Sequence, residues 1–278
     1  MNRIYIKIIH RILDSIHKKK LFANNIFLSI ILENFIAFIS GKDVRFSHNR
    51  GRKLIKAKEK NLVRFYADPS RCFWLYRNGI SARGKFMHKS YCIDKLIFSK
   101  KDVVLDCGAN SGDLFLELKG RISSDNYIGI EPNPRDFEVL KLNCPNTTLI
   151  NKALGIEKSF LDFFVATSNG DSSLIRPKNF QNIIKVDVIS LKQLMNDLNL
   201  DKVKLLKLEA EGFEPEILRG AGDRLKDIEY IAIDGGYERG ISEEETFTTL
   251  TNFLIKKNFQ ILDIYFPWYR GLFKNSNF

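Results

Sequence analysis

The sequence is poor in the residues from which disulfide frameworks, zinc sites and histidine-based triads are built. It has four cysteines and four histidines, and no two cysteines form a C-x-x-C pair. All the histidines lie in the first hundred residues, away from the glycine-rich stretch "VVLDCGANSG" at 103–112. We therefore expect a reducing compartment, no metal site, and no Ser-His-Asp triad at that stretch.

Long hydrophobic runs are also missing. Ile4, Ile8, Ile12 and Ile16 recur every four residues between basic side chains, which predicts an amphipathic basic helix. The segment 21–40 is more apolar, but polar residues interrupt it too often for it to span a bilayer, and no secretory cleavage site is evident. Two interpretations stay open: a helical pair packed on the rest of the chain, or an element lying in a membrane interface.

Charge is divided unequally along the chain. Residues 1–100 carry 22 Lys and Arg against 6 Asp and Glu, whereas residues 101–278 carry 22 against 27. A basic front indicates an anionic partner, such as a phospholipid surface, a phosphate-bearing substrate or nucleic acid; the alternative is that the charges only solubilise an extension. We expect a basic helical extension and linker over 1–60, a lead-in or cap over 61–100, and the main domain over 101–278.

From residue 102 onward, short β-branched segments alternate with helical ones. This alternation predicts right-handed βαβ units and a mostly parallel sheet with helices on both faces, which is an α/β fold. The expected strands are 102–107, 127–134, 147–154, 159–167, 182–190, 203–209, 228–234 and 259–266.

The glycine-rich stretch directly follows the first of these strands. That strand ends on Asp106, and Gly108, Ala109 and Gly112 precede a helix, so bare backbone and free helix N–H groups can approach a ligand. The spacing is not G-x-G-x-x-G, no P-loop lysine follows, and the carboxylate would repel a pyrophosphate. Glu131 ends the second strand, where it can accept hydrogen bonds from both ribose hydroxyls. The combination indicates a nucleoside with a nearby positive charge, such as S-adenosylmethionine; the alternative is an ordinary strand-to-helix turn.

Five segments form an ordered set of motifs: "VVLDCGANSGD", "YIGIEPNPRDFEVLKLN", "LINKALG", "VDVISLKQL" and "LLKLEAEGFEPEILRGA". In this order they resemble the FkbM family of S-adenosylmethionine-dependent methyltransferases, over residues 85–265. The resemblance implies the class I methyltransferase fold, a Rossmann-like seven-stranded sheet with an antiparallel last strand. It also implies which residues surround the cofactor. Asp106, Gly108, Asn110 and Gly112 line its methionine end. Glu131 and Asn133 lie around the ribose, and Lys152 and Ala153 lie near the adenine.

Three acids at the carboxyl ends of later strands are the candidates for catalysis. Methyl transfer to a hydroxyl needs orientation, exclusion of water and a base, and Glu209, Glu211 and Asp234 lie on the rim where the first strand also ends. The segment "LKLEAEG" departs from the I-K-I-D-V-E-G that is common in the family, and Asp234 stands where a glutamate is frequent. The alternatives are that one or more of these acids caps a helix, pairs with Lys207 or Arg219, or binds a divalent metal.

Two further features belong to the same rim. The polar loop at 167–177 follows a strand there, and it either closes over the substrate or is a simple surface loop. Trp268 and Tyr269 lie in the aromatic tail, where they either stack on a sugar ring or fill the core.

The leading hypothesis is an O-methyltransferase that acts on a hydroxyl of a carbohydrate, because characterised members of the family that the chain resembles mostly methylate sugars and natural products. The acceptor would be a surface polysaccharide or a glycan precursor. The enzyme would be cytoplasmic, with residues 1–60 in peripheral contact with the anionic inner face of the membrane. One alternative is a nucleic-acid methyltransferase, which is disfavoured because no N-P-P-Y motif is present. The other is a catalytically silent, membrane-associated scaffold, which the intact glycine-rich stretch disfavours.

Overall fold

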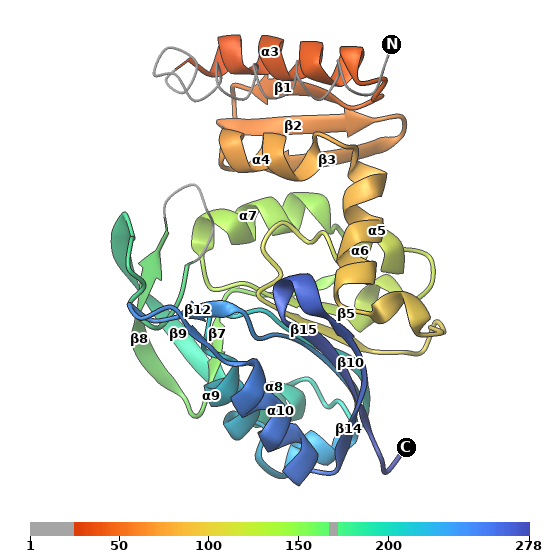
Figure 1. Ribbon diagram of the computed structural model, residues 1–278, viewed down its shortest axis with the longest axis vertical. Coiled ribbons are helices and arrows are strands. Elements are labelled where there is room, and N and C mark those ends of the chain that lie inside the picture. The colour runs from red at the N-terminus through yellow and green to blue at the C-terminus, as the bar shows by residue number, and fades with distance from the viewer. Residues whose placement is uncertain (1–24, 167–171) are drawn as a thin grey trace. The chain divides into compact units, whose positions relative to one another are not determined.

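The computed structural model describes residues 25–166 and 172–278, and the chain divides into two compact units, Met1–Arg83 and Gly84–Phe278. The N-terminal unit contains an antiparallel sheet in the order β1–β2–β3, on which helices α3 and α4 pack (Figure 1). The helix expected at the very start of the chain lies outside the described residues. The elements of this unit are α3 (Ile26–Ile39), β1 (Arg45–Asn49), β2 (Leu54–Glu59), β3 (Leu62–Tyr66) and α4 (Pro69–Tyr76).

The basic segment 41–60, for which the sequence predicts a linker or surface loop, contains the β1–β2 hairpin instead. Burial alternates along it, with Phe46, Ile55 and Ala57 inside and Arg45 and Lys58 outside. The basic side chains therefore occupy the solvent face of two strands. The density of Lys and Arg hides this period of two in the sequence.

The C-terminal unit is built on a seven-stranded sheet in the order β14–β15–β11–β10–β4–β5–β6 (Figure 1). Five neighbouring strands are parallel, and β15 is antiparallel to both β11 and β14. This confirms the expected α/β, class I methyltransferase arrangement with an antiparallel last strand. The strands are β4 (Val104–Cys107), β5 (Tyr127–Ile130), β6 (Thr148–Ile150), β10 (Val203–Leu208), β11 (Ile228–Asp234), β14 (Phe259–Tyr265) and β15 (Arg270–Asn275).

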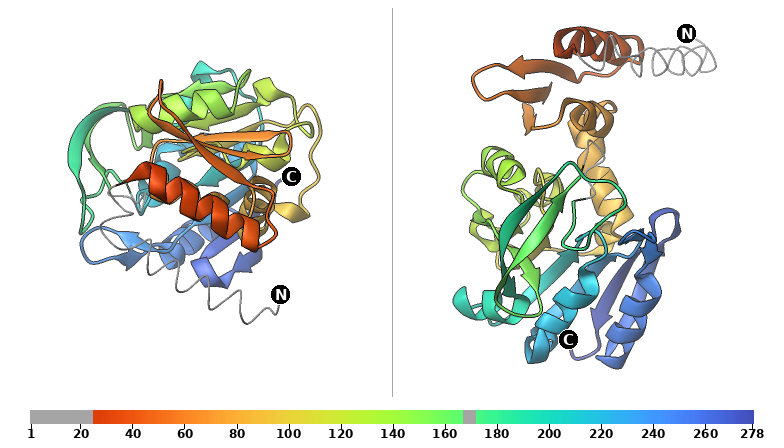
Figure 2. Two further views of the ribbon diagram at one scale, coloured as in Figure 1. Left: turned by 90° about the horizontal axis from the view of Figure 1, so that it is seen from above. Right: turned by 90° about the vertical axis from the view of Figure 1, so that its left-hand side faces the viewer.

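Helices cover both faces of this sheet (Figures 1 and 2). One face carries the end of α5 (Ile80–Ser90), α6 (Phe115–Leu118) and α7 (Pro134–Asn143); the other carries α8 (Leu191–Asp197), α9 (Glu214–Gly220) and α10 (Phe247–Lys256). The short helical turns are η1 (Ile93–Lys95), η2 (Ser124–Asn126), η3 (Gly222–Asp227) and η4 (Phe266–Trp268). The small sheets comprise β7 (Ala153–Gly155), β8 (Ser159–Val165) and β9 (Asn182–Ser190), and β12 (Tyr237–Arg239) and β13 (Glu244–Glu245).

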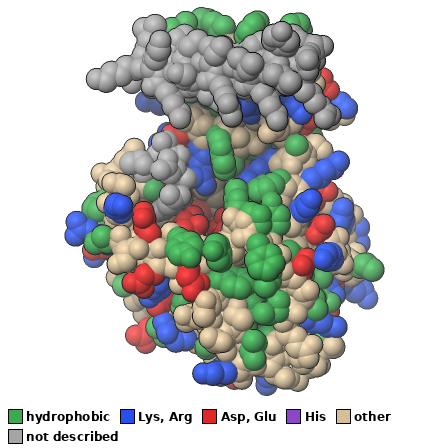
Figure 3. Space-filling view, in the orientation of Figure 1, with side chains coloured by type: hydrophobic (Ala, Val, Ile, Leu, Met, Phe, Trp, Pro, Cys, Tyr) green, Lys and Arg blue, Asp and Glu red, His purple; other side chains and the backbone are tan. Residues whose placement is uncertain are grey.

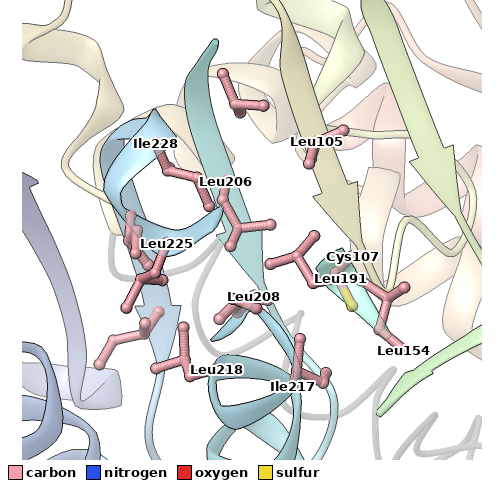
Figure 4. Close-up of a cluster of buried hydrophobic side chains, with 14 of the residues drawn as sticks. Leu105, Cys107, Leu154, Leu191, Leu206, Leu208, Ile217, Leu218, Leu225 and Ile228 are labelled. Atoms are coloured by element: carbon pink, nitrogen blue, oxygen red, sulfur yellow. The ribbon is translucent and has the colours of Figure 1, made fainter. Parts of the chain in front are cut away.

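Alternate side chains of the central strands enter two different cores. Leu105, Leu206 and Leu208 point to the side of α8 and α9, where they pack with Ile217 and Leu218 (Figure 4). The alternate side chains of the same sheet point to the side of α5, α6 and α7. The apolar ones include Val104, Leu205, Ala232 and Leu272. The period of two thus decides which strand residues can reach which face.

The sequence prediction stops at the strand 259–266 and misses β15. This strand follows the one-turn helix η4 and inserts between β11 and β14. Of its two pairing partners, β14 is adjacent in the sequence but β11 lies far away. The preceding Pro267 and the glycine within β15 also weaken the sequence signal for a strand. No helix in the described part of the chain is long and apolar enough to cross a membrane.

Candidate active site at the carboxyl ends of the strands

The glycine-rich loop after β4 packs tightly on other parts of the chain. Gly108 (φ 71°) donates its N–H to the carbonyl of Ile130 (3.0 Å), and a Cβ on Gly108 would lie 1.9 Å from the carbonyl oxygen of Glu209. A Cβ on Gly112 (φ 81°) would lie 2.3 Å from Sγ of Cys144. Internal packing therefore explains both glycines, and it is the neighbouring acids that indicate a bound nucleoside.

Glu131 follows β5 and is buried beside this loop. One carboxylate oxygen accepts the N–H of Asn110 (2.9 Å), and the other accepts the N–H of Asn133 (2.9 Å). Both oxygens are thereby oriented, and each keeps a second lone pair for a hydroxyl donor. Burial raises the pKa of Glu131 to about 8; Asp136 adds to the rise and the two backbone donors oppose it.

Charged side chains alternate with the apolar ones on the α5–α6–α7 side of the sheet. The strand register sets Lys207 of β10 opposite Asp106 of β4, with Nζ 3.1 Å from Oδ1, and both side chains are buried. It likewise sets Asp234 of β11 opposite Arg270 of β15, with Oδ2 2.6 Å from Nε. The hydroxyl of Tyr127 donates to the second oxygen of Asp106 (2.5 Å). Each buried carboxylate therefore meets a cation from the neighbouring strand.

Glu209 links these two ion pairs. Its carboxylate lies 2.8 Å from Nζ of Lys207 and 3.0 Å from Nη2 of Arg270, and its side chain is 25% exposed. Burial lowers the pKa of Lys207, but Asp106 and Glu209 outweigh burial and raise this pKa above its usual value. The alternative that Glu209 pairs with Lys207 is confirmed. A carboxylate held between two cations is a weak base, so this geometry favours a positioning role for Glu209.

Aromatic rings surround Arg270. Its guanidinium lies 4.1 Å from the ring centre of Tyr91 and 4.6 Å from that of Trp268. Trp268 and Tyr269 are both partly exposed, so the alternative that they fill the core is wrong. Tyr269 meets the exposed Tyr237 edge-on, with ring centres 5.2 Å apart.

Glu211, in the loop after β10, is hydrogen-bonded through its side chain to Glu238, which lies in β12. The loop after β10 and strand β12, which carry these two residues, are in direct contact. A Cβ on Gly212 would lie 2.6 Å from Cα of Arg239, and the guanidinium of Arg239 donates to the carbonyl of Gly212 and pairs with Glu216 (3.0 Å). Glu238 is a candidate that the sequence prediction missed.

A hydrogen bond between two carboxyl groups requires a proton on one of them. Burial, followed by the negative charge of Asp234, Glu214 and Glu209, raises the pKa of Glu238 to about 9. Glu238 therefore keeps its proton at neutral pH. Both side chains are only half-buried, so the pair can meet a substrate.

The other acids of this rim are occupied inside the protein. Glu214 is buried and accepts the N–H groups of Ala210 (2.6 Å) and Gly212 (3.4 Å), and Asp234 is buried against Arg270. Figure 3 shows acidic side chains gathered in one area of the surface of the C-terminal unit, beside hydrophobic ones. Within residues 25–166 and 172–278, no three His, Cys, Asp or Glu side chains are grouped so that they could hold a metal ion.

The remaining predicted residues lie around Glu131. Asn133 caps α7, with its side chain accepting the N–H of Arg135 (3.1 Å). Ala153 begins β7 and is buried, while Lys152 is half-buried, with Nζ 3.9 Å from Asp187.

Two features beside the predicted residues were missed or are described only in part. The side chain of Asn151, which the sequence prediction missed, donates to the carbonyl of Glu131 (2.8 Å). Residues 167–171 of the expected substrate loop lie outside the described residues, but the hydroxyl of Ser173 donates to the carbonyl of Glu211 (2.9 Å). The described end of that loop is thus attached to the acidic rim.

Comparison with known protein families shows the family of the chain that carries this rim. The model of the methyltransferase FkbM domain matches residues 106–261, from Asp106 in β4 into β14. The chain belongs to the FkbM methyltransferase family. Its methyl donor is therefore S-adenosylmethionine.

Three individual proteins are also similar to this FkbM methyltransferase, each at low sequence identity. Methyltransferase 1 of Beauveria bassiana (strain ARSEF 2860) is 25% identical over 206 residues, which are 64% of this chain and 81% of the relative. A SAM-dependent methyltransferase from Aquifex aeolicus has 13% identity and a TM-score of 0.42, over 74% of this chain and 93% of its own. Aeropyrum pernix fibrillarin, solved with S-adenosyl-L-methionine, has 13% identity and a TM-score of 0.41, over 83% and 97%.

The residues of this FkbM methyltransferase fit the cofactor best at its ribose. Glu131 is buried, is oriented by two backbone donors and has acceptor capacity to spare, as two adjacent hydroxyls require. Asp106 differs from expectation in one respect: its counter-charge is Lys207, a cation of the chain itself, so its carboxylate does not need a cationic ligand. The bound cofactor would thus meet a neutral ion pair behind the glycine-rich loop.

Proposed function

We propose that this FkbM methyltransferase transfers the methyl group of S-adenosylmethionine to a hydroxyl of a carbohydrate, in a surface polysaccharide or a glycan precursor. The observation that carries the proposal is the half-buried carboxyl pair Glu211–Glu238 on the rim where β4, β10 and β11 end. A hydroxyl needs a base when it attacks, and an ionised carboxylate in a partly dry setting is such a base. The exposed rings of Tyr237 and Tyr269 offer faces on which a sugar can stack.

The charge of the rim favours a carbohydrate over a nucleic acid. Five carboxyl groups gather there, and the whole unit 84–278 carries 26 Lys and Arg against 28 Asp and Glu. A phosphate backbone would be repelled from such a surface. The second candidate, a nucleic-acid acceptor, is favoured by the unit 1–83, which carries 18 Lys and Arg against 5 Asp and Glu.

Each group has one task in the proposed reaction. S-adenosylmethionine supplies a methyl group on a sulfonium, whose transfer leaves a neutral thioether. Glu131 and Asn133 would hold the ribose, and Lys152 and Ala153 would lie at the adenine. The methionine end is held by the loop after β4, at Asp106, Gly108, Ala109, Asn110 and Gly112.

The acids of the rim divide into one base and two positioning groups. In the proposed step Glu211, as a carboxylate, takes the hydroxyl proton of the acceptor as the new carbon–oxygen bond forms. Glu209 and Asp234 act through Arg270, which they hold beside the aromatic rings.

Replacing the base is expected to slow methyl transfer without weakening cofactor binding. Glu211→Gln should lower kcat by about a hundredfold, because a positioned general base contributes about that much or more. Glu244→Gln, at an exposed acid of the neighbouring strand β13, is the matched control and should leave kcat unchanged. A single-turnover assay with radiolabelled S-adenosylmethionine measures the rate, and equal rates in both variants would remove Glu211 from the mechanism.

Cofactor affinity is expected to depend on pH through Glu131. The ribose hydroxyls donate to the ionised carboxylate, and burial raises the pKa of this group to about 8. Affinity should therefore rise as the pH increases from about 6.5 to 8.5, by up to about tenfold per pH unit below the pKa. Glu131→Gln should bind weakly at every pH, whereas Glu138→Gln, at an exposed acid of α7, should follow the wild type. Calorimetric titration with S-adenosylhomocysteine tests this, and a pH-independent wild type would contradict it.

Acceptor choice decides between the proposed functions. The purified chain is incubated with labelled S-adenosylmethionine and, in parallel, with free, nucleotide-linked and lipid-linked glycans and with RNA. Label in a glycan supports the proposal, and label in RNA supports the second candidate. A folded protein that fails to bind the cofactor would instead be a silent scaffold.

The proposed location is the cytoplasm, at the inner face of the membrane. All four cysteines are described and buried, and none is in a disulfide, as a reducing compartment favours. A lipid-linked acceptor would be met at that face.

A further inference from the structure

Helix α3 has its polar and apolar residues in inverted positions. Its exposed residues are all large and hydrophobic, with exposed fractions of 63% for Phe27, 51% for Ile31, 52% for Phe35 and 69% for Phe38. Their spacing of four, four and three residues sets them on one side of the helix, over about 16 Å. We call these four residues the α3 outer face.

The polar residues of α3 point inward instead. Glu33 is buried and forms an ion pair with Arg77 (2.7 Å). Asn34 makes two hydrogen bonds with the backbone of Phe46 (2.7 and 2.9 Å), and Ser29 is buried. A surface helix in water normally shows the opposite arrangement, and a contiguous apolar face of this kind marks an interaction site.

The exposed charge of the same unit is almost entirely positive. Of its acids, Glu33 pairs with Arg77, Glu59 accepts the N–H of Ser81 (2.7 Å) and Asp68 caps α4. Among the described residues of the unit, one acid, Asp43, is exposed, against six cations. These cations are Arg45, Arg50, Arg52, Lys53, Lys58 and Lys60.

We propose that the α3 outer face docks the protein on an anionic lipid surface, with α3 lying in the plane of the interface. Phe and Ile side chains enter the boundary between headgroups and acyl chains, and the exposed cations of the same unit meet the negative headgroups. The inward position of Glu33 fits this, because an outward acid would be repelled by the headgroups. This inference concerns a surface of the N-terminal unit and does not rest on the proposed acceptor.

A lipid surface fits the α3 outer face better than a second copy of the chain. Two copies would bring together two units that each carry 18 Lys and Arg against 5 Asp and Glu, and like charges oppose that contact. Residues 1–24, which precede α3, carry six Lys and Arg against one Asp, so their composition also suits anionic headgroups.

Flotation of the full chain with vesicles tests the proposal. The wild type should float with phosphatidylcholine vesicles that contain phosphatidylglycerol, and less with pure phosphatidylcholine or at high salt. Phe35→Ser together with Phe38→Ser should lower the partition coefficient by about tenfold or more. Phe160→Ser with Ile183→Ser is the matched control, because these side chains in the other unit are 69% and 47% exposed. A wild type that does not float, or an F35S/F38S variant that floats as well as the wild type, overturns the proposal.

A second readout identifies what covers the α3 outer face. Phe35→Trp should give tryptophan fluorescence that lipids with brominated acyl chains quench, beyond the quenching of the parent chain. Two outcomes overturn the proposal. One is a lipid-free dimer that F35S/F38S converts to a monomer, which would show that a second copy covers the face. The other concerns the added tryptophan of the F35W variant in the absence of lipid. If iodide does not quench its fluorescence in the full chain but does so when residues 1–24 are deleted, this segment covers the face.

Discussion

Replacing Lys207 by methionine is expected to lower the free energy of unfolding by about 3–5 kcal/mol, the usual cost of removing one partner of a buried ion pair. Lys207 is buried between Asp106 and Glu209, at 3.1 and 2.8 Å, and it also donates to the carbonyl of Gly108 (2.9 Å). Methionine fills similar volume but leaves the Asp106 carboxylate buried, with the hydroxyl of Tyr127 still donating to it. The same change removes the group that ties the glycine-rich loop to β10, so cofactor affinity should fall as well.

Lys204→Met provides the matched control. Lys204 lies on the same strand and pairs with Glu229 at 3.0 Å, but both side chains are partly exposed, so its loss should cost no more than about 1 kcal/mol. Thermal unfolding should show a midpoint about 10 °C lower for K207M and a change of a few degrees at most for K204M. Equal shifts in the two variants would mean that the buried pair does not stabilise the fold.

The acids of the rim could be predicted because local sequence carries the signal. An apolar run that stops at a carboxylate shortly before a glycine or a helix start marks the carboxyl end of a parallel strand. Asp106, Glu131, Glu209 and Asp234 all follow this pattern, and the structure has each at or directly after the end of a strand. The fold class followed from the same alternation of strands and helices.

Partners across the sheet could not be predicted, because register is a non-local property. Lys207 stands in the apolar run "VKLLKLE" at a position that alternates with leucines, which already indicates a buried lysine in need of a carboxylate. Which carboxylate it meets depends on how β10 aligns with β4. Arg270 was missed for a stronger reason, since the strand that carries it was not recognised.

Glu238 shows the same limit for catalysis. In the sequence it is one acid in "GGYERGISEEE", with nothing to separate it from the acids that follow. Its pairing with Glu211 arises because Gly212 and Arg239 bring the loop after β10 into contact with strand β12. The proposed base therefore belongs to the tertiary structure, whereas the proposed ribose acceptor Glu131 belongs to a local motif.

Gly108→Ala is expected to have the second large effect, on both stability and cofactor binding. The new methyl group would lie 1.9 Å from the backbone oxygen of Glu209, and the residue would have to keep a φ of 71°. Overpacking and left-handed backbone strain together cost about 2–5 kcal/mol. Because the loop must move away from β10 to relieve the clash, the affinity for the cofactor should also fall.

Gly120→Ala separates the two causes. Gly120 has a φ of 86° but no atom within 4 Å of a Cβ, so it carries the backbone strain of about 1–2 kcal/mol without the clash. Calorimetric titration with S-adenosylhomocysteine should find wild-type affinity for G120A and a loss of at least about tenfold for G108A. If both variants bind the ligand equally well, the contact between the loop after β4 and the end of β10 does not shape the cofactor site, and the acids alone must hold it.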